Sequence, residues 1–223
     1  MNELDRMNGD FYHEFFDPGD LVYDIGAHVG KWTQACLENG AGHVVAIEPQ
    51  HALAEALVQR FAGKPVSVLA SAVGDTPGTA NMFQCEVDTI ATLDPTWTQQ
   101  RFAGYAWKVG ETVFVNTLDA IIGVYGLPRF IKIDVEGFEV KVLEGLSVPI
   151  DSFAIEYTAE VSDHLIQCIN LIEQFGIPYE YSYNIGDYPI FKCAWGDRNS
   201  VITELQSQWR PDIWGNAYMR RRG

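Results

Sequence analysis

The chain has 223 residues, the size of one domain, and its 15 basic and 30 acidic residues give a formal net charge of −15. So acidic a chain lacks the dense basic face that binds a bare nucleic-acid backbone, and we expect no nucleic-acid partner. No apolar run approaches the roughly 20 residues of a membrane helix, and the four cysteines lack metal or disulfide spacing, so we expect a cytoplasmic protein without a membrane partner.

The chain alternates between short β-branched runs and helical stretches. In its first half, the pattern predicts strands and helices at Leu21–Ile25, Lys31–Asn39, Val44–Ile47, about Ala52–Phe61 and Val66–Leu69. The alternation returns later, with elements predicted at Ile131–Val135, Glu136–Leu146, Phe153–Tyr157 and Asp163–Phe175. Strands buried on both faces and separated by helices are typical of a doubly wound, mostly parallel α/β sheet.

Two regions interrupt this alternation. Gly74–Thr117 holds two strand-like runs around a segment rich in Thr, Trp and Gln, which predicts an inserted antiparallel pair with a substrate loop. Near the C-terminus, two of three candidate strands should form a hairpin: Tyr181–Ile185, Ile190–Trp195 and Ala217–Arg220. We therefore expect a single domain over residues 1–223, with an N-terminal helical cap (1–19), the insertion (74–117) and a C-terminal hairpin and tail (178–223).

The strongest local motif is VYDIGAHVG, residues 22–30. A strand ends near Asp24, Gly26 makes the turn, and Gly30 lies near the start of the next helix. The G-x-x-x-G spacing differs from the G-x-G-x-x-G of nicotinamide-dinucleotide sites, which disfavours an oxidoreductase. A carboxylate at this strand end repels a pyrophosphate and attracts an ammonium or sulfonium group. The motif thus predicts a cation-bearing small molecule, unless the glycines only shape a tight turn.

A second acidic residue, Glu48, directly follows the strand VVAI. At the end of the second strand of a doubly wound sheet, a carboxylate can accept hydrogen bonds from both hydroxyls of a ribose. Pro49 then constrains the chain so that Gln50 turns toward the base. Together with the upstream glycine turn, Glu48 predicts an adenosine-type ligand.

The third motif is FIKIDVEG, residues 130–137. Lys132 and Asp134 share one face of the strand, and Asp134 lies at its carboxyl end, where ligands bind in open α/β sheets. Glu136 follows at the turn, and Glu156 lies near the end of the next strand. This group can orient or deprotonate a hydroxyl nucleophile, with Asp134 as the base, Glu136 as the next candidate and Lys132 as an electrostatic aid.

Structural roles for the same residues remain open. Glu136 can complement a helix dipole, and Lys132 can simply pair with a carboxylate inside the sheet. Asp134, Glu136 and Glu156 are oxygen ligands suited to Mg²⁺, but no histidine pair has ligand spacing. A divalent metal is possible, but nothing in the sequence supports one, and none is predicted.

These motifs resemble the FkbM family of S-adenosylmethionine-dependent methyltransferases, a branch of the class I, Rossmann-like methyltransferases. The matching stretches, in the family's order, are FDPGDLVYDIGAHVGKWT, VVAIEP, SAVGD, VNTLDAI and FIKIDVEGFEVKVLEGL, from about Phe16 to Tyr157. The last stretch is the most diagnostic. The resemblance implies a seven-stranded sheet, S-adenosyl-L-methionine as cofactor and S-adenosyl-L-homocysteine as product.

The resemblance also implies residue roles. Asp24, Gly26 and Gly30 would surround the amino-acid end of the cofactor, Glu48 would hold the ribose, and residues 71–73 would flank the adenine. Asp134 and Glu136 would face the transferred methyl and the acceptor. The expected cofactor-binding set is Asp24, Gly26, Ala27, His28, Gly30, Glu48, Pro49, Gln50, Ser71, Ala72, Val73 and Asp134.

The expected activity is O-methylation of a hydroxyl on a small molecule, sugar or natural product, and the resemblance alone suggests this acceptor class. The alternative is a catalytically idle, nucleoside-binding protein that uses its insertion to contact a partner. Methyl transfer to a hydroxylated acceptor distinguishes the two.

Overall fold

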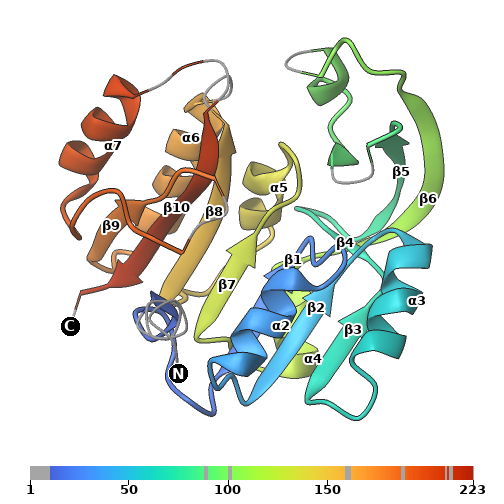
Figure 1. Ribbon diagram of the computed structural model, residues 1–223, viewed down its shortest axis with the longest axis horizontal. Coiled ribbons are helices and arrows are strands. Elements are labelled where there is room, and N and C mark those ends of the chain that lie inside the picture. The colour runs from blue at the N-terminus through green and yellow to red at the C-terminus, as the bar shows by residue number, and fades with distance from the viewer. Residues whose placement is uncertain are drawn as a thin grey trace.

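The computed structural model describes residues 11–87, 90–99, 102–158, 162–186, 189–208, 210 and 213–222. Its centre is a seven-stranded sheet (Figure 1), whose strands in spatial order are β3 (Val66–Leu69), β2 (His43–Ile47), β1 (Leu21–Ile25), β7 (Phe130–Ile133), β8 (Ser152–Thr158), β10 (Trp214–Arg221) and β9 (Tyr179–Tyr183). β10 runs antiparallel to both of its neighbours, whereas β3, β2, β1, β7 and β8 are mutually parallel. The predicted doubly wound, mostly parallel fold is confirmed.

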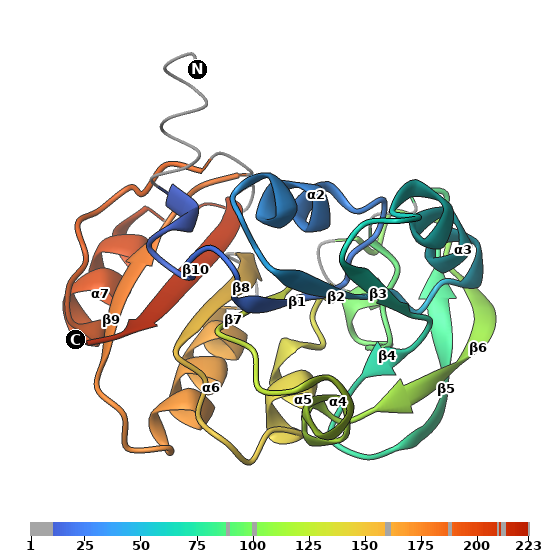
Figure 2. The ribbon, with the colours of Figure 1, turned by 90° about the horizontal axis from the view of Figure 1, so that it is seen from below.

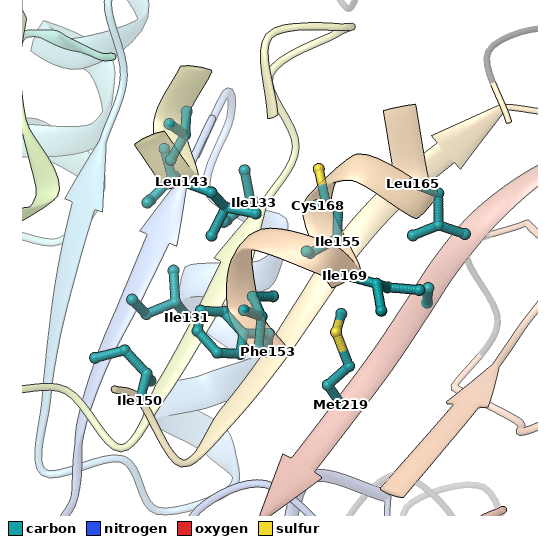
Figure 3. Close-up of a cluster of buried hydrophobic side chains, with 14 of the residues drawn as sticks. Ile131, Ile133, Leu143, Ile150, Phe153, Ile155, Leu165, Cys168, Ile169 and Met219 are labelled. Carbon is teal, nitrogen blue, oxygen red and sulfur yellow. The ribbon is translucent and has the colours of Figure 1, made fainter. Parts of the chain in front are cut away.

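Helices cover both faces of this sheet (Figure 2). α2 (Lys31–Glu38) and α3 (His51–Arg60) lie on one face, and α4 (Leu118–Tyr125), α5 (Glu139–Glu144) and α6 (Ser162–Glu173) lie on the other. Side chains alternate along each strand, so Ile131 and Ile133 of β7 point toward α5 and α6. There they join a fully apolar cluster that includes Phe153 and Ile169 (Figure 3). Lys132, between the two isoleucines, therefore faces the α2 side.

The insertion forms a second, smaller sheet. It consists of β4 (Ala72–Val73), β6 (Lys108–Asn116) and β5 (Gly78–Gln84), in that order. β5 and β6 pair antiparallel, which confirms the predicted inserted pair. The chain between them includes a short 3₁₀ helix, η2 (Trp97–Gln99). In Figure 1, β5 and β6 rise beyond the carboxyl ends of β1 and β2, which brings the insertion to that edge of the main sheet.

The segment after β7 differs from the prediction. The expected strand Ile131–Val135 ends at Ile133, and the expected helix Glu136–Leu146 begins only at Glu139. Glu136 and Gly137 lie between them with φ values of 54° and 92°, in the left-handed region that a right-handed helix excludes. Residues 134–138 therefore form a separate loop, which we call the acidic loop.

The C-terminal region confirms an antiparallel pair between two of the three candidate strands, the first and the third. β9 and β10 pair through residues such as Tyr181 and Met219, and α7 (Arg198–Ser207) connects them. The predicted strand Ile190–Trp195 does not form. Phe191 and Trp195 instead pack their rings against the N-terminal residues Phe11 and Phe15, so this segment covers the sheet as an aromatic layer. Residues 1–10 of the predicted N-terminal cap lie outside the described residues.

Helices α4 and α7 each begin after a residue whose side chain caps the helix, Thr117 for α4 and Asp197 for α7. Each cap accepts a hydrogen bond from a backbone N–H of the first turn, which stabilises the helix start. Within the described part of the chain, every helix is too short or too polar to cross a bilayer.

Candidate active site

A cavity of about 590 Å³ opens at the carboxyl ends of β1, β2, β7 and β8. This is where ligands bind in open α/β sheets, and the volume is within the range of small-molecule sites. Nearly all residues expected at the site from the sequence line it: Asp24, Gly26, Ala27, His28, Glu48, Pro49, Gln50, Ser71, Ala72, Val73, Lys132, Asp134 and Glu136. Residues from four separate regions of the chain thus meet at one place.

The two glycines of the first motif have different roles. A Cβ atom on Gly26 would lie 1.8 Å from the carbonyl oxygen of Asp134, so only glycine lets the β1 turn approach the end of β7. Gly30 is not among the residues lining the cavity. It precedes α2 with φ 78°, and a Cβ there would meet the ring of Phe61 at 2.5 Å. Gly30 thus permits the packing of this turn against α3.

Asp24 is a buried carboxylate at the wall of the cavity. Its Oδ2 accepts a hydrogen bond of 2.6 Å from the Thr33 hydroxyl of α2, whereas its buried Oδ1 has no hydrogen-bond partner in the described structure. Burial raises the pKa of Asp24 above its ordinary value. An orphaned carboxylate oxygen at a cavity wall fits a ligand that carries a positive charge or a hydrogen-bond donor.

Glu48 is held in a fixed orientation by the backbone. Its Oε2 accepts from the N–H of His28 and its Oε1 from the N–H of Gln50, both at 2.9 Å. His28 makes the turn possible by adopting a left-handed conformation, with φ 48°. Burial raises the pKa of Glu48. Each oxygen keeps lone-pair capacity for another donor, so the carboxylate can accept from two vicinal hydroxyls, as a ribose would require.

Lys132, which is buried, forms an ion pair with the partly exposed Asp134. Nζ of Lys132 lies 2.6 Å from Oδ2 of Asp134 and above the ring of Trp32, 5.3 Å from its centroid. Lys132 is also directly opposite Asp24 in the register of β7 and β1. Burial opposes the charge of Lys132, but Asp134 and Asp24 outweigh it and raise the pKa of the ammonium. Burial likewise acts to raise the pKa of Asp134, yet Lys132 holds that pKa below its usual value.

Glu156 shares the acidic end of the cavity with Asp134. The two carboxyl groups hydrogen-bond each other, and oxygens of Asp134, Glu136 and Glu156 lie within 4.8 Å of one another. Burial first, and then the charges of Asp134 and Glu136, raise the pKa of Glu156 well above its ordinary value. Within the pair, Glu156 thus favours the protonated form and Asp134 favours the ionised form.

The same three carboxyl groups are an oxygen donor set suited to a hard divalent cation. The ammonium of Lys132 already offsets part of their charge, because it lies directly at Asp134. The donor set thus has a positive partner of its own within the chain.

Several cavity residues had no clear signal in the sequence. Thr92 and Phe102 come from the insertion, Trp32 from α2, and Thr158 and Trp214 from the ends of β8 and β10. Thr158 lies two positions after Glu156 on the same face of β8, and its buried hydroxyl has no hydrogen-bond partner in the described structure. The strand period could have located Thr158, whereas the insertion residues depend on a loop path that no local pattern specifies.

Comparisons with known proteins agree with this geometry. A family model described as "Methyltransferase FkbM domain" matches residues 24–207. No curated protein matches the sequence. Among solved structures, a precorrin-6y C5,15-methyltransferase from Geobacter metallireducens GS-15 has a TM-score of 0.50 at 9% identity, over 100% of this chain and 93% of that chain. An rRNA methylase from Streptococcus thermophilus has a TM-score of 0.47 at 13% identity, over 100% and 99% of the two chains.

At such low identity, the solved structures speak only for the fold, whereas the family model covers most of the chain, including the residues of the cavity. The orphaned oxygen of Asp24 and the oriented carboxylate of Glu48 fit the cationic and ribose parts of S-adenosylmethionine. The chain therefore belongs to the FkbM methyltransferase family and is an S-adenosylmethionine-dependent methyltransferase.

Proposed function

We propose that this methyltransferase transfers the methyl group to a hydroxyl oxygen of a small molecule, a sugar or a natural product. The observation that supports this most is the acidic end of the cavity, where oxygens of Asp134, Glu136 and Glu156 lie within 4.8 Å of one another. Carboxyl groups accept hydrogen bonds from hydroxyls and can take up the proton that a hydroxyl loses on methylation.

The cofactor-binding residues of the cavity would align the methyl donor with the acceptor. S-adenosylmethionine supplies a methyl group activated by a sulfonium centre, so the protein mainly has to position donor and acceptor. Asp24 faces the positively charged part of the cofactor, and Glu48 accepts from the ribose hydroxyls. Ser71, Ala72 and Val73 line the wall expected to flank the adenine.

Proton removal is assigned to Asp134 together with Glu156. Asp134 favours the ionised form because Lys132 lowers its pKa. The acceptor hydroxyl would donate a hydrogen bond to this carboxylate. Its proton would move there as the new O–C bond forms and the methyl–sulfur bond breaks, with S-adenosyl-L-homocysteine as the leaving group. Before the transfer, the ammonium of Lys132 stabilises the negative charge of Asp134. Glu136 contributes a further acceptor for neighbouring hydroxyls.

The proposed acceptor is not a nucleic acid. A net charge of −15 and a cavity edge built from carboxylates repel a phosphate backbone. We also propose a cytoplasmic location without a membrane partner. All four cysteines are free thiols in the structure, which suits a reducing compartment.

The experiment is a methyl-transfer assay with labelled cofactor and a library of hydroxylated acceptors, read by mass spectrometry. The proposal expects a product that carries the label on oxygen, and Asp134→Asn and Glu156→Gln should each lower kcat by about 100-fold, the usual scale of acid–base catalysis. Asp75→Asn, an exposed carboxylate beside Lys141, is the matched control. Cofactor binding without transfer to any acceptor would instead favour the idle binding protein, and methylation on nitrogen or carbon would contradict O-methylation.

A further inference from the structure

The acidic loop, residues 134–138, carries two of the proposed cavity carboxylates in an unusual backbone conformation. Glu136 and Gly137 are consecutive residues with positive φ, and a non-glycine residue such as Glu136 adopts this region at an energetic cost. Such a conformation persists only where surrounding contacts hold it. The contacts that fix the loop therefore also fix the direction of the Glu136 side chain.

One of these contacts comes from α5. The side chain of Glu139 is buried, and its Oε1 accepts from the N–H of Val135 at 3.2 Å and from the N–H of Gly137 at 3.1 Å. These two donors are on either side of Glu136. Glu139 does not line the main cavity, but it borders a small adjoining one with His164 and Cys168. Its carboxylate thus contacts the acidic loop from the side of the small cavity, away from any ligand in the main cavity.

The insertion contacts the same loop. The Thr92 hydroxyl donates a 2.7 Å hydrogen bond to the carbonyl oxygen of Glu136. The ring of Trp97 lies so close to Gly137 that a Cβ there would be 2.6 Å from it. Thr92 and Trp97 thus hold the loop from the insertion, and Glu139 holds it from α5.

We propose that Glu139 is a positioning residue for methyl transfer, whose carboxylate orients the acidic loop so that Asp134 and Glu136 face the acceptor. This rests on the proposed function, because it assigns the loop carboxylates to the acceptor. Glu139 itself touches neither donor nor acceptor. Removing the carboxylate oxygens of Glu139 should lower kcat more than it weakens cofactor binding, since most of the proposed cofactor-binding residues lie on other turns.

The experiment compares Glu139→Met, which keeps side-chain length but removes the carboxylate oxygens, with Glu139→Gln, whose amide oxygen can replace Oε1. Glu144→Gln, an exposed glutamate of α5 paired with Lys141, is the control. NMR hydrogen exchange should show the Val135 and Gly137 amides deprotected in Glu139→Met but protected in Glu139→Gln and the control. In Glu139→Met, kcat should fall about tenfold or more while the cofactor Kd changes little, and Glu139→Gln should restore kcat.

Three results would overturn the inference: unchanged amide protection in Glu139→Met, equal losses of kcat in the Met and Gln variants, or a Glu139→Met protein that does not fold. The last would make Glu139 a purely structural residue. If the wild-type protein methylates no hydroxyl, the proposed function fails, but amide exchange still decides whether Glu139 holds the loop.

Discussion

Asp24, Lys132 and Asp134 form a row of charged side chains at the ends of β1 and β7, of which Asp24 and Lys132 are buried. Lys132 lies opposite Asp24 in the strand register and pairs with Asp134 at 2.6 Å, so one cation serves two carboxylates. The pKa of Asp24 stays raised because burial outweighs the attraction of Lys132. A ligand cation beside Asp24 would supply the missing positive charge. The charges at this end of the sheet therefore favour a cationic cofactor.

Replacing Lys132 should change the titration of its partner. In Lys132→Gln the pKa of Asp134 should rise, because burial, which raises it, then acts without the ammonium that lowers it. The measurement is carbon-detected NMR of the Asp134 side-chain carboxyl across pH. Lys64→Gln, at an exposed lysine bonded to Gln34, is the control. An unchanged Asp134 midpoint in Lys132→Gln would show that the ion pair does not set this pKa.

Glu48, Asp134 and Glu136 lie in the short segments after β2 and β7. The acidic loop shows how tertiary contacts determine the conformation of such a segment. The sequence VEGFEVKVLEGL has helical spacing, yet Glu136 and Gly137 adopt positive φ and the helix starts at Glu139. Hydrogen bonds from Glu139 and Thr92 stabilise this alternative. Those partners lie on α5 and in the insertion, so local propensity alone favours the wrong helix start.

The pKa of Glu139 gives a test of the buried carboxylate in this element. Burial raises it to about 7, above the ordinary 4.5, despite the N–H donors of Gly137 and Val135. A raised folded-state pKa stabilises the fold below the unfolded value, and this contribution is lost as pH rises through about 7. Glu139→Gln removes the titration, so its Tm relative to wild type should increase between about pH 5 and about pH 8.5.

Thermal unfolding of both proteins at several pH values measures this difference, with Glu144→Gln as the exposed control. A Tm difference that is the same at every pH would mean that Glu139 does not titrate in this range.

Much of the fold was predictable because buried parallel strands have a strong local signature. The bounds of β1, β2, β3, β7 and β8 lie within one or two residues of the predicted ones. Asp24 and Glu48 could be picked out as site candidates because they lie at the ends of predicted strands. Ile190–Trp195 was misassigned because its aromatic residues, apolar like those of a strand, pack against Phe11 and Phe15. Phe102 and Thr92 reach the cavity through the insertion, whose path depends on long-range contacts.

Across the whole molecule, the fold concentrates charge of one sign at one end of the sheet. The acidic donor set of Asp134, Glu136 and Glu156 lies at that end, and Lys132 is a positive partner within the chain. Lys132 can therefore offset part of the negative charge of these carboxylates without an added cation. A role for an added divalent cation is therefore open to a direct test.

Removal of metal ions should leave cofactor affinity and methyl transfer unchanged. The protein is dialysed against a strong chelator, assayed, and assayed again after addition of Mg²⁺ or Mn²⁺. Loss of transfer that either ion restores would contradict this expectation and assign the carboxylates to a metal.

The central claim is that Asp24 and Glu48 bind S-adenosylmethionine at the ends of β1 and β2. Isothermal titration of the cofactor into the wild-type protein, Asp24→Asn and the exposed control Asp75→Asn tests it most directly. We expect micromolar binding to the wild type and to the control. Asp24→Asn should bind the cofactor about tenfold or more weakly than the wild type, since a charged hydrogen bond contributes about 1.5–3 kcal/mol. No heat with the wild type at millimolar cofactor, or equal affinity in Asp24→Asn, would contradict it.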